Sequence, residues 1–348
     1  MKDKKDLTRR DFLKRSATVG LGIAGTSGLA VASHGKTKPI ARSDRLPREV
    51  WIASVSLEGL EARTPEEMID RILIRMEKTA AYQPDIICLP EIVPFMKLSK
   101  RPPLSECAEV PPGPITTRFT DYAKKHHCYV VCPTYTKERD RFYNSAVIIN
   151  RDGIVMGESR KIRPTVTEME RGIIPGPLKP PVFKTDFGRI GVQICFDVNW
   201  RGGWQYLQQS GAEIIFWPSA FGGGRMLNAY AWINQCYIVT STRPDPTRII
   251  DITGDDLATS GRFKHWVCTS INLEKAFIHL WPYVQSFNAL RAKYGRQLDV
   301  TVYGHEEWAT IESLLPDLRV SDVLQEFGIA THKEHISQAQ KMQEKYYE

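Results

Sequence analysis

The fold is decided by residues 187–200, which read FGRIGVQICFDVNW. Ile190, Val192 and Ile194 alternate with small or polar residues, and this period of two predicts a short buried strand. Cys195 ends the strand, and a polar, aromatic segment follows it. A thiol at the end of a core strand can face a pocket, although a free Cys is more often a buried structural residue. The role of Cys195 therefore depends on the residues that the rest of the chain brings to it.

Strands and helices alternate on both sides of this stretch. Short apolar runs predict buried strands, and amphipathic segments with capping residues predict helices. The expected strands cover 50–55, 84–91, 128–135, 144–149, 153–158, 213–217, 237–241, 249–257 and 267–273, and the expected helices begin near 64, 115, 204 and 226. This order, with one hairpin around Asn150–Gly153, predicts an α/β layered sandwich and not a barrel.

The ends of the chain differ from this central part. Residues 33–48 form a polar linker, and the main domain is expected to cover 49–280. Beyond Glu274 the pattern becomes irregular and helix-leaning, and it ends in the charged, Gln-rich segment 333–348. We expect 281–348 to be a C-terminal extension that contacts a partner subunit.

Residues 1–32 are typical of an export signal. The segment Thr8–Lys14 resembles the twin-arginine signature, and a Gly/Ala-rich apolar stretch leads to a small-residue site at Ala30–Ala32. That stretch is too short and too rich in glycine for a stable membrane span, and no other run reaches the ~20 apolar residues that a span needs. We expect the twin-arginine (Tat) export machinery as a partner and a folded, periplasmic or secreted protein.

Composition indicates an ordinary globular protein. The 348 residues suffice for one large or two ordinary domains, and 42% hydrophobic and 25% charged residues are usual values. The net charge of +7 is partly local, because residues 1–32 hold seven basic and three acidic residues. No basic patch is interleaved with aromatic residues, so nucleic acid is not an expected partner.

The seven cysteines do not form a disulfide framework. Cys128 and Cys132, with His126 and His127 beside them, suggest a metal or redox site as one alternative. The residues between the two cysteines read as a strand, however, and the sequence offers no second ligand pair. Core thiols are the better interpretation, and we expect neither a metal nor a cofactor.

Two further strand ends carry ionisable groups. Glu91 follows Leu89-Pro90, and Lys161 follows the strand that ends at Arg160. A cysteine nucleophile needs a base that removes its proton and a positive charge that stabilises a tetrahedral oxyanion. Glu91, Lys161 and Cys195 together can supply these three roles.

With their flanking residues, these groups resemble the nitrilase (carbon–nitrogen hydrolase) superfamily. The matching pieces, in order, are Leu89-Pro90-Glu91, Tyr143–Val147 with Arg151-Asp152-Gly153, Arg160-Lys161, Phe187–Gly191 leading to Ile194–Asp197, and Gly211–Ile215 with Trp217–Ala220. The resemblance covers about residues 49 to 280. It implies a nitrilase-like four-layer αββα sandwich and a homo-oligomer, at least a dimer.

The resemblance also implies roles for single residues. Cys195 would be the nucleophile, Glu91 the general base and Lys161 the oxyanion stabiliser, with the backbone N–H of Phe196 as a second oxyanion donor. Many amidase-type members carry a further glutamate between the lysine and the cysteine. Glu168 and Glu170 are the candidates here, and we favour Glu168.

The substrate class rests on the residues after the nucleophile. True nitrilases usually continue with Trp-Glu, whereas this chain has Phe196-Asp197, which is closer to amidases and carbamoylases. We therefore expect a small linear amide or N-carbamoyl substrate, with a nitrile as the alternative and a non-catalytic binding paralogue as a third interpretation. Trp200, Trp217 and Ser219 are expected to line the pocket.

Overall fold

The structure is a computed structural model that describes residues 46–347. Its centre consists of two six-stranded sheets. The strands of the first sheet, in spatial order, are β12 (Trp266–Asn272), β1 (Glu49–Val55), β2 (Ile86–Cys88), β3 (Tyr129–Glu138), β4 (Arg141–Ile149) and β5 (Val155–Arg160). Those of the second are β11 (Asp256–Thr259), β10 (Arg248–Ile250), β9 (Tyr237–Thr242), β8 (Ile214–Ser219), β7 (Arg189–Val192) and β6 (Phe183–Lys184).

The two sheets pack face to face through a shared apolar core. Because side chains alternate along a strand, Val50 and Ile52 of β1 face this core while Ala53 and Val55 face the other way. The second sheet contributes Ile190, Val192, Ile214, Phe216 and Val239 from its own inner face. A single buried layer therefore joins the sheets.

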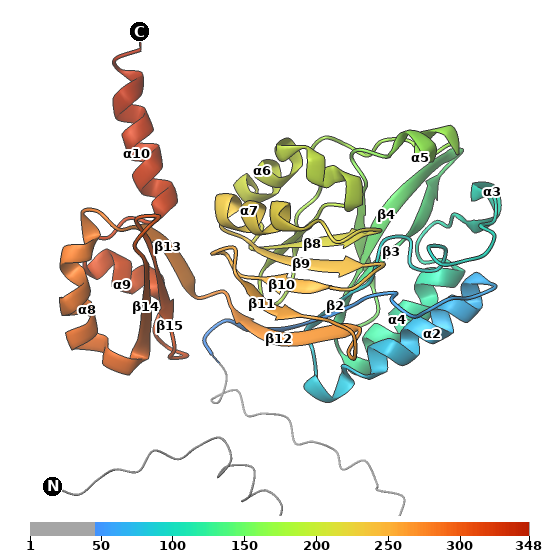
Figure 1. Ribbon diagram of the computed structural model, residues 1–348, viewed down its shortest axis with the longest axis horizontal. Coiled ribbons are helices and arrows are strands. Elements are labelled where there is room, and N and C mark those ends of the chain that lie inside the picture. The colour runs from blue at the N-terminus through green and yellow to red at the C-terminus, as the bar shows by residue number, and fades with distance from the viewer. Residues whose placement is uncertain (1–45, 348) are drawn as a thin grey trace, which may run out of the picture. The chain divides into compact units, whose positions relative to one another are not determined.

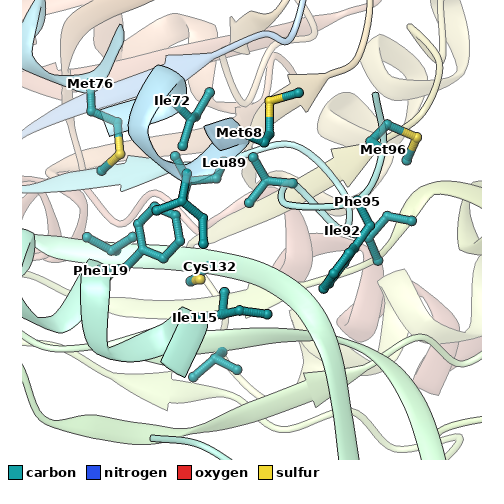
Figure 2. Packing of buried hydrophobic residues seen from close by; sticks show 14 of the residues in the cluster. Met68, Ile72, Met76, Leu89, Ile92, Phe95, Met96, Ile115, Phe119 and Cys132 are labelled. Atoms are coloured by element: carbon teal, nitrogen blue, oxygen red, sulfur yellow. The ribbon is translucent and has the colours of Figure 1, made fainter. Parts of the chain in front are cut away.

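Helices cover both outer faces. On the first sheet, α2 (Pro65–Glu77) and α4 (Pro114–His126) bury a cluster that contains Met68, Ile72, Phe119 and Cys132 (Figure 2). On the second, α6 (Arg201–Gln209) and α7 (Arg225–Asn234) cover β8, β9 and β10 (Figure 1). The order helix, sheet, sheet, helix is the expected αββα sandwich.

Local sequence explains where these elements begin and how the cysteines are placed. Thr64 caps α2 by accepting a hydrogen bond from the Glu67 N–H at 3.2 Å, and Pro65 occupies the first helical position. Cys128 and Cys132 are fully buried in the α2–α4 cluster, as expected for core thiols.

The parallel strands determine where a site can form. In the first sheet β2 runs parallel to β1 and β3, and in the second β7, β8 and β9 run parallel to one another. Their carboxyl ends open onto loops, which is where ligands bind in sheets of this kind. The hydroxyl of Ser241 on β9 donates to the carbonyls of Val55 at 2.7 Å and Cys88 at 3.1 Å, and so joins the two sheets near that edge.

The C-terminal part differs from the irregular, helix-leaning segment that the sequence predicted. It contains a three-stranded antiparallel sheet in the order β13 (Lys275–His279), β15 (Trp308–Ser313) and β14 (Leu298–Tyr303). The helices α8 (Phe287–Tyr294) and α9 (Val320–Glu326) complete its small core. The last helix, α10 (His332–Glu344), buries none of its residues. Contact of this part with a partner subunit stays a prediction.

The remaining elements are short. They are α3 (Leu104–Cys107), α5 (Val166–Glu170), η2 (Ala80–Tyr82), η3 (Cys195–Asn199), η4 (Tyr283–Ser286) and η5 (Gly295–Gln297). Between residues 46 and 347 no helix is both long and apolar enough to cross a membrane. The twin-arginine segment and most of the linker lie outside the described residues.

Candidate active site

Glu91 and Lys161, which the sequence placed at two separate strand ends, lie in direct contact. The Lys161 ammonium is 2.7 Å from Oε1 of Glu91, and both side chains are almost completely buried. Glu91 follows β2, and Lys161 follows β5, where its N–H continues the sheet by donating to the Asn144 carbonyl at 2.8 Å. Main-chain pairing thus fixes the position of the lysine.

Cys195 occupies a strained turn at the carboxyl end of β7. The strand ends at Val192, three residues earlier than predicted, and Cys195 begins the short helix η3 with a φ of 47°. A positive φ is rare for a residue other than glycine and costs on the order of 1–3 kcal/mol. Ile92, directly after Glu91, has a φ of 38°, an even less favourable conformation for a β-branched side chain. Strained backbone of this kind is concentrated at functional sites.

A second carboxylate binds the same lysine. Glu168 in α5 places Oε2 2.7 Å from the Lys161 ammonium, and the N–H of Thr165 donates to this oxygen at 2.8 Å. Thr165 in turn caps α5 by accepting from the Glu168 N–H at 3.2 Å, so a capping box holds the glutamate in place. Glu170, the other candidate from the sequence, is exposed.

Asn144 connects the two glutamates, and the sequence analysis gave it no role. Its Nδ2 group donates to Oε1 of Glu91 at 2.8 Å and to Oε1 of Glu168 at 2.7 Å. Its Oδ1 atom is buried and has no hydrogen-bond partner within residues 46–347. The Tyr143–Val147 motif was the available signal, because a buried strand that contains an Asn must give that amide a partner.

The charges in the site support one another. Burial alone would lower the pKa of Lys161, but the carboxylates of Glu91 and Glu168 and the nearby Cys195 outweigh it and raise that pKa well above its usual value. Burial would raise the pKa of Glu168, and Lys161 overcomes this effect and lowers it. At neutral pH both groups therefore stay ionised.

Cys195 rests as a neutral thiol. Burial and the negative charge of Glu91 raise its pKa to about 12, whereas Lys161 and hydrogen bonds from the Ala220 N–H and the Ser219 hydroxyl lower it. The thiol must therefore lose its proton to a base during the reaction and not before it.

Asp197 holds the loops of Lys161 and Cys195 together. Its carboxylate accepts hydrogen bonds from the backbone N–H groups of Arg163 at 2.7 Å, Ile194 at 2.9 Å and Ile162 at 3.3 Å. Burial raises its pKa to about 6, against the effect of these three donors. The sequence offered Asp197 only as a family marker, and the structure shows what it binds.

The structure places two predicted pocket residues elsewhere. Trp217 lies on the outer face of β8, in the core under α6 and α7, and its indole N–H donates to the Cys195 carbonyl at 3.1 Å. Trp200 is 41% exposed and packs edge-on against Phe196, over a separate hollow. Neither tryptophan lines the cavity that contains Cys195. Trp217 therefore supports the turn and does not form a wall of the pocket.

Ser219 and Phe196 flank Cys195. Ser219, which the sequence analysis placed in the pocket lining, ends β8 and is fully buried beside the thiol, outside the cavity wall. Phe196 follows the cysteine in the first turn of η3, where backbone N–H groups lack partners inside the helix.

The cavity around these groups has a volume of about 220 Å³. Glu91, Lys161, Glu168 and Cys195 all contribute to its wall. Sequence reasoning missed the remaining polar part of the wall, which comes from four separate segments of the chain and consists of Arg101, Tyr135, Thr165, Thr167, Arg171 and Arg243. Nowhere in 46–347 do three or more His, Cys, Asp or Glu side chains form a group suited to a metal ion.

Comparison with known families gives a match over most of the described chain. The family model described as carbon-nitrogen hydrolase matches residues 51–276. A nitrilase of Pyrococcus abyssi is 31% identical over 180 residues, which cover 50% of this chain and 68% of that protein.

Two further relatives match over shorter stretches. Beta-ureidopropionase of Arabidopsis thaliana is 33% identical over 147 residues, 40% of this chain and 36% of that protein. Deaminated glutathione amidase of Bos taurus is 32% identical over 122 residues, 31% of this chain and 37% of that protein. This chain therefore spans little more than a third of the length of either protein.

Solved structures show the same fold at low sequence identity. Saccharomyces cerevisiae Nit3, described as a member of branch 10 of the nitrilase superfamily, has a TM-score of 0.58 and 19% identity, and covers 72% of this chain and 96% of its own. An amidase from Nesterenkonia sp. has a TM-score of 0.55 and 17% identity, with 64% and 90% covered.

Proposed function

The chain belongs to the carbon–nitrogen hydrolase family, and on that basis we propose that it hydrolyses a small linear amide or N-carbamoyl compound. Cys195 is the nucleophile, Glu91 the general base and Lys161 the oxyanion stabiliser. The reaction passes through a thioester and releases ammonia or an amine.

One observation carries the proposal. The Lys161 ammonium lies 2.7 Å from the carboxylates of both Glu91 and Glu168 and shares a small cavity with a thiol on a strained turn. An ion pair this deeply buried stabilises a protein little, since desolvation of the charges offsets most of their attraction. Its position beside Cys195 supports a catalytic role.

The first half of the reaction forms the thioester. Glu91 accepts the Cys195 proton while the sulfur forms a bond to the amide carbonyl carbon, and the carbonyl π electrons move to oxygen. Lys161 and the Phe196 N–H stabilise the oxyanion; one such donor is worth about 3 kcal/mol in comparable sites. The carbonyl then re-forms, the C–N bond breaks, and the leaving nitrogen takes the proton from Glu91.

The second half releases the acid. Glu91 accepts a proton from a water molecule, whose oxygen bonds to the thioester carbon. When this intermediate collapses, the C–S bond breaks and the proton returns to the Cys195 sulfur. Glu168 and Asn144 do not exchange protons in this scheme; they hold Lys161 and Glu91 in position through the contacts given above.

A nitrile is the alternative substrate. The relative from Pyrococcus abyssi is named a nitrilase, whereas the relatives from Arabidopsis thaliana and Bos taurus are named a ureidopropionase and an amidase. The Phe196-Asp197 sequence after the nucleophile favours the amide and carbamoyl classes for this chain.

The test measures ammonia release over a panel of linear amides, N-carbamoyl compounds and nitriles. We expect turnover of at least one amide or carbamoyl compound, and none by Cys195→Ala at unchanged melting temperature. Cys268→Ala, which removes a thiol outside the cavity, is the matched control. Unchanged hydrolysis in Cys195→Ala would refute the mechanism, and faster turnover of nitriles than of amides would reverse the substrate assignment.

Two further proposals concern the whole protein. We propose export by the twin-arginine pathway to the periplasm or the medium, which replacement of Arg9 and Arg10 by lysine should block in a cell-fractionation assay. We also propose a homo-oligomer, which light scattering on the purified protein tests. A monomer at micromolar concentration would contradict it.

A further inference from the structure

Three arginines from distant parts of the chain meet at the catalytic cavity. Arg101 lies in the loop before α3, Arg171 caps the C-terminus of α5, and Arg243 follows β9. All three are exposed, so they belong to the mouth of the cavity and not to its floor, where Cys195 and Lys161 are buried. Their convergence from separate segments is the feature that needs an explanation.

Contacts within the protein hold the side chains of Arg101 and Arg171 in place without neutralising them. Arg101 donates from Nε to the Phe95 carbonyl at 3.1 Å, and the Arg171 guanidinium lies 6.0 Å from the centroid of the Tyr135 ring. The rings of Phe95 and Tyr135 stack with centroids 5.3 Å apart, so the two residues that contact these arginines pack against each other. The backbone of Arg243 is fixed at the cavity, because its N–H donates to the Ser219 carbonyl at 2.9 Å.

The charge around the cavity is not balanced. Its wall carries four cationic side chains and two carboxylates. Lys161 already binds both carboxylates, at 2.7 Å each. Within residues 46–347, Arg101, Arg171 and Arg243 form no ion pair shorter than 4 Å. Many other arginines of the chain are paired. A small cavity with excess positive charge attracts an anion.

A carboxylate is the anion that suits this mouth. The guanidinium group presents a planar set of N–H donors that matches a carboxylate in a bidentate arrangement. At about 30 Å³ per water molecule, a cavity of 220 Å³ holds roughly seven waters, so it suits a short chain that reaches from the floor to the mouth.

We propose that the substrate carries a carboxylate at the end away from the scissile C–N bond, and that Arg101, Arg171 and Arg243 bind it. The carbonyl lies at Cys195 and Lys161 while the acid group lies at the mouth. This inference rests on the proposed hydrolase function and adds the substrate class to it. The contrary explanation is that the arginines serve general solubility and contact no substrate.

The experiment compares pairs of substrates that differ only in the acid group. One pair is 5-amino-5-oxopentanoate and pentanamide, and the other is N-carbamoyl-3-aminopropanoate and N-propylurea. We expect kcat/KM to be at least tenfold higher for the acid of each pair at low salt. The preference should shrink in 0.5 M NaCl, because screening weakens interactions at an exposed mouth.

Single variants test whether each of the three arginines binds the substrate carboxylate. Arg101→Gln, Arg171→Gln and Arg243→Gln should each raise KM for the acid several-fold with little change in its kcat, since a remote carboxylate binds equally in the ground and transition states. The triple variant should bring the acid-to-neutral ratio close to one. Arg296→Gln, at an exposed arginine of the C-terminal part, is the matched control and should keep the ratio.

The outcomes separate this inference from the proposed function. If Cys195-dependent turnover is equal for both members of each pair, or if the single variants keep the ratio, the inference is wrong and the hydrolase function stands. If no amide, carbamoyl compound or nitrile is turned over at all, the proposed function fails. Melting temperatures of the single variants show that any loss is local, because each replaces an exposed side chain.

Discussion

Replacement of Asn144 by Asp should disable the site without changing its shape. The side chains are isosteric, but the new oxygen takes the place of Nδ2, 2.8 Å from Oε1 of Glu91 and 2.7 Å from Oε1 of Glu168. Two donated hydrogen bonds to charged acceptors become two contacts between oxygens. The change therefore tests whether Asn144 positions the base.

The magnitude follows from the charges. Glu91, Glu168 and Lys161 together carry one negative charge, and a second one about 4 Å away costs roughly 4 kcal/mol at an effective dielectric constant of 20. This cost corresponds to about three pKa units, so the introduced carboxyl group should titrate near pH 7 instead of near 4. Below that pH it is neutral and can donate to one glutamate; above it, it repels both.

The assay is kcat/KM for an amide substrate of the wild type and the variant between pH 5.5 and 9. We expect a loss of about 100-fold at pH 7.5, which grows as the pH rises and shrinks as it falls toward 6. Asn144→Ala, which removes the hydrogen bonds without adding charge, should lose activity without this dependence on pH.

Asn288→Asp, at an exposed position in α8, is the control for an added carboxylate and should behave as wild type. If Asn144→Asp stays within threefold of wild type across the whole range at unchanged melting temperature, Asn144 does not position the glutamates, and our account of the site is wrong.

Three further predictions test single contacts. Glu168→Gln should lower kcat about 100-fold, because Lys161 loses one of its two carboxylates. Glu170→Gln changes an exposed side chain and should leave kcat unchanged. Equal effects of the two variants would show that Glu168 does not position Lys161. The pKa of Asp197 is raised from 3.8 to about 6, so its protonated carboxyl group favours the folded state below pH 4. The free energy of unfolding should fall by about 3 kcal/mol as the pH rises from 4 to 6, because Asp197 ionises first in the unfolded chain. Asp197→Asn should therefore flatten the decline in unfolding free energy between pH 4 and 7 in urea titrations, and a parallel decline in both proteins would contradict this. Trp217→Phe should cost about 1 kcal/mol of stability through the lost hydrogen bond to Cys195, with KM unchanged; a raised KM would return Trp217 to the substrate pocket.

The sequence was sufficient for most strands of the two central sheets and for the three strand-end residues, for a shared physical reason. A carboxylate, an ammonium or a thiol that directly follows an apolar strand lies at the edge of the sheet, where the strand ends and a loop begins. The resemblance of their flanking motifs to one family, and not the strand pattern alone, grouped Glu91, Lys161 and Cys195 into one site, and parallel strands explain why such strand ends open onto loops that bind ligands.

Trp217 shows what a buried strand does not reveal. Both faces of β8 are apolar: Ile214 and Phe216 pack between the sheets, while Ile215 and Trp217 pack under the helices. Such a strand reads as a continuous hydrophobic run, and the side on which a given residue lies depends on register. The sequence analysis therefore placed Trp217 near Cys195, where it lies, but on the wrong face of the strand.

The C-terminal sheet and the arginines were missed for other reasons. Residues 298–303 do alternate in polarity, but only Leu298 is buried, so the strand gave a weak signal against the charged helices around it. Arg101, Arg171 and Arg243 have no common spacing, because they come from three loops whose meeting point is a property of the folded sandwich alone.

The site depends on how the two sheets are joined. Glu91 and Lys161 extend from the first sheet, whereas Cys195 and Ser219 extend from the second, so the nucleophile and its base have no common strand. The shared apolar core and cross-links such as these fix their relative position: Ser241 donates to the carbonyls of Val55 and Cys88, and Asp197 binds the backbone beside Lys161. A change that lets the sheets slide by 1 Å would separate the proton donor from its acceptor without unfolding the protein. Loss of activity at constant stability is therefore expected from mutations in this junction, in residues that never contact the substrate.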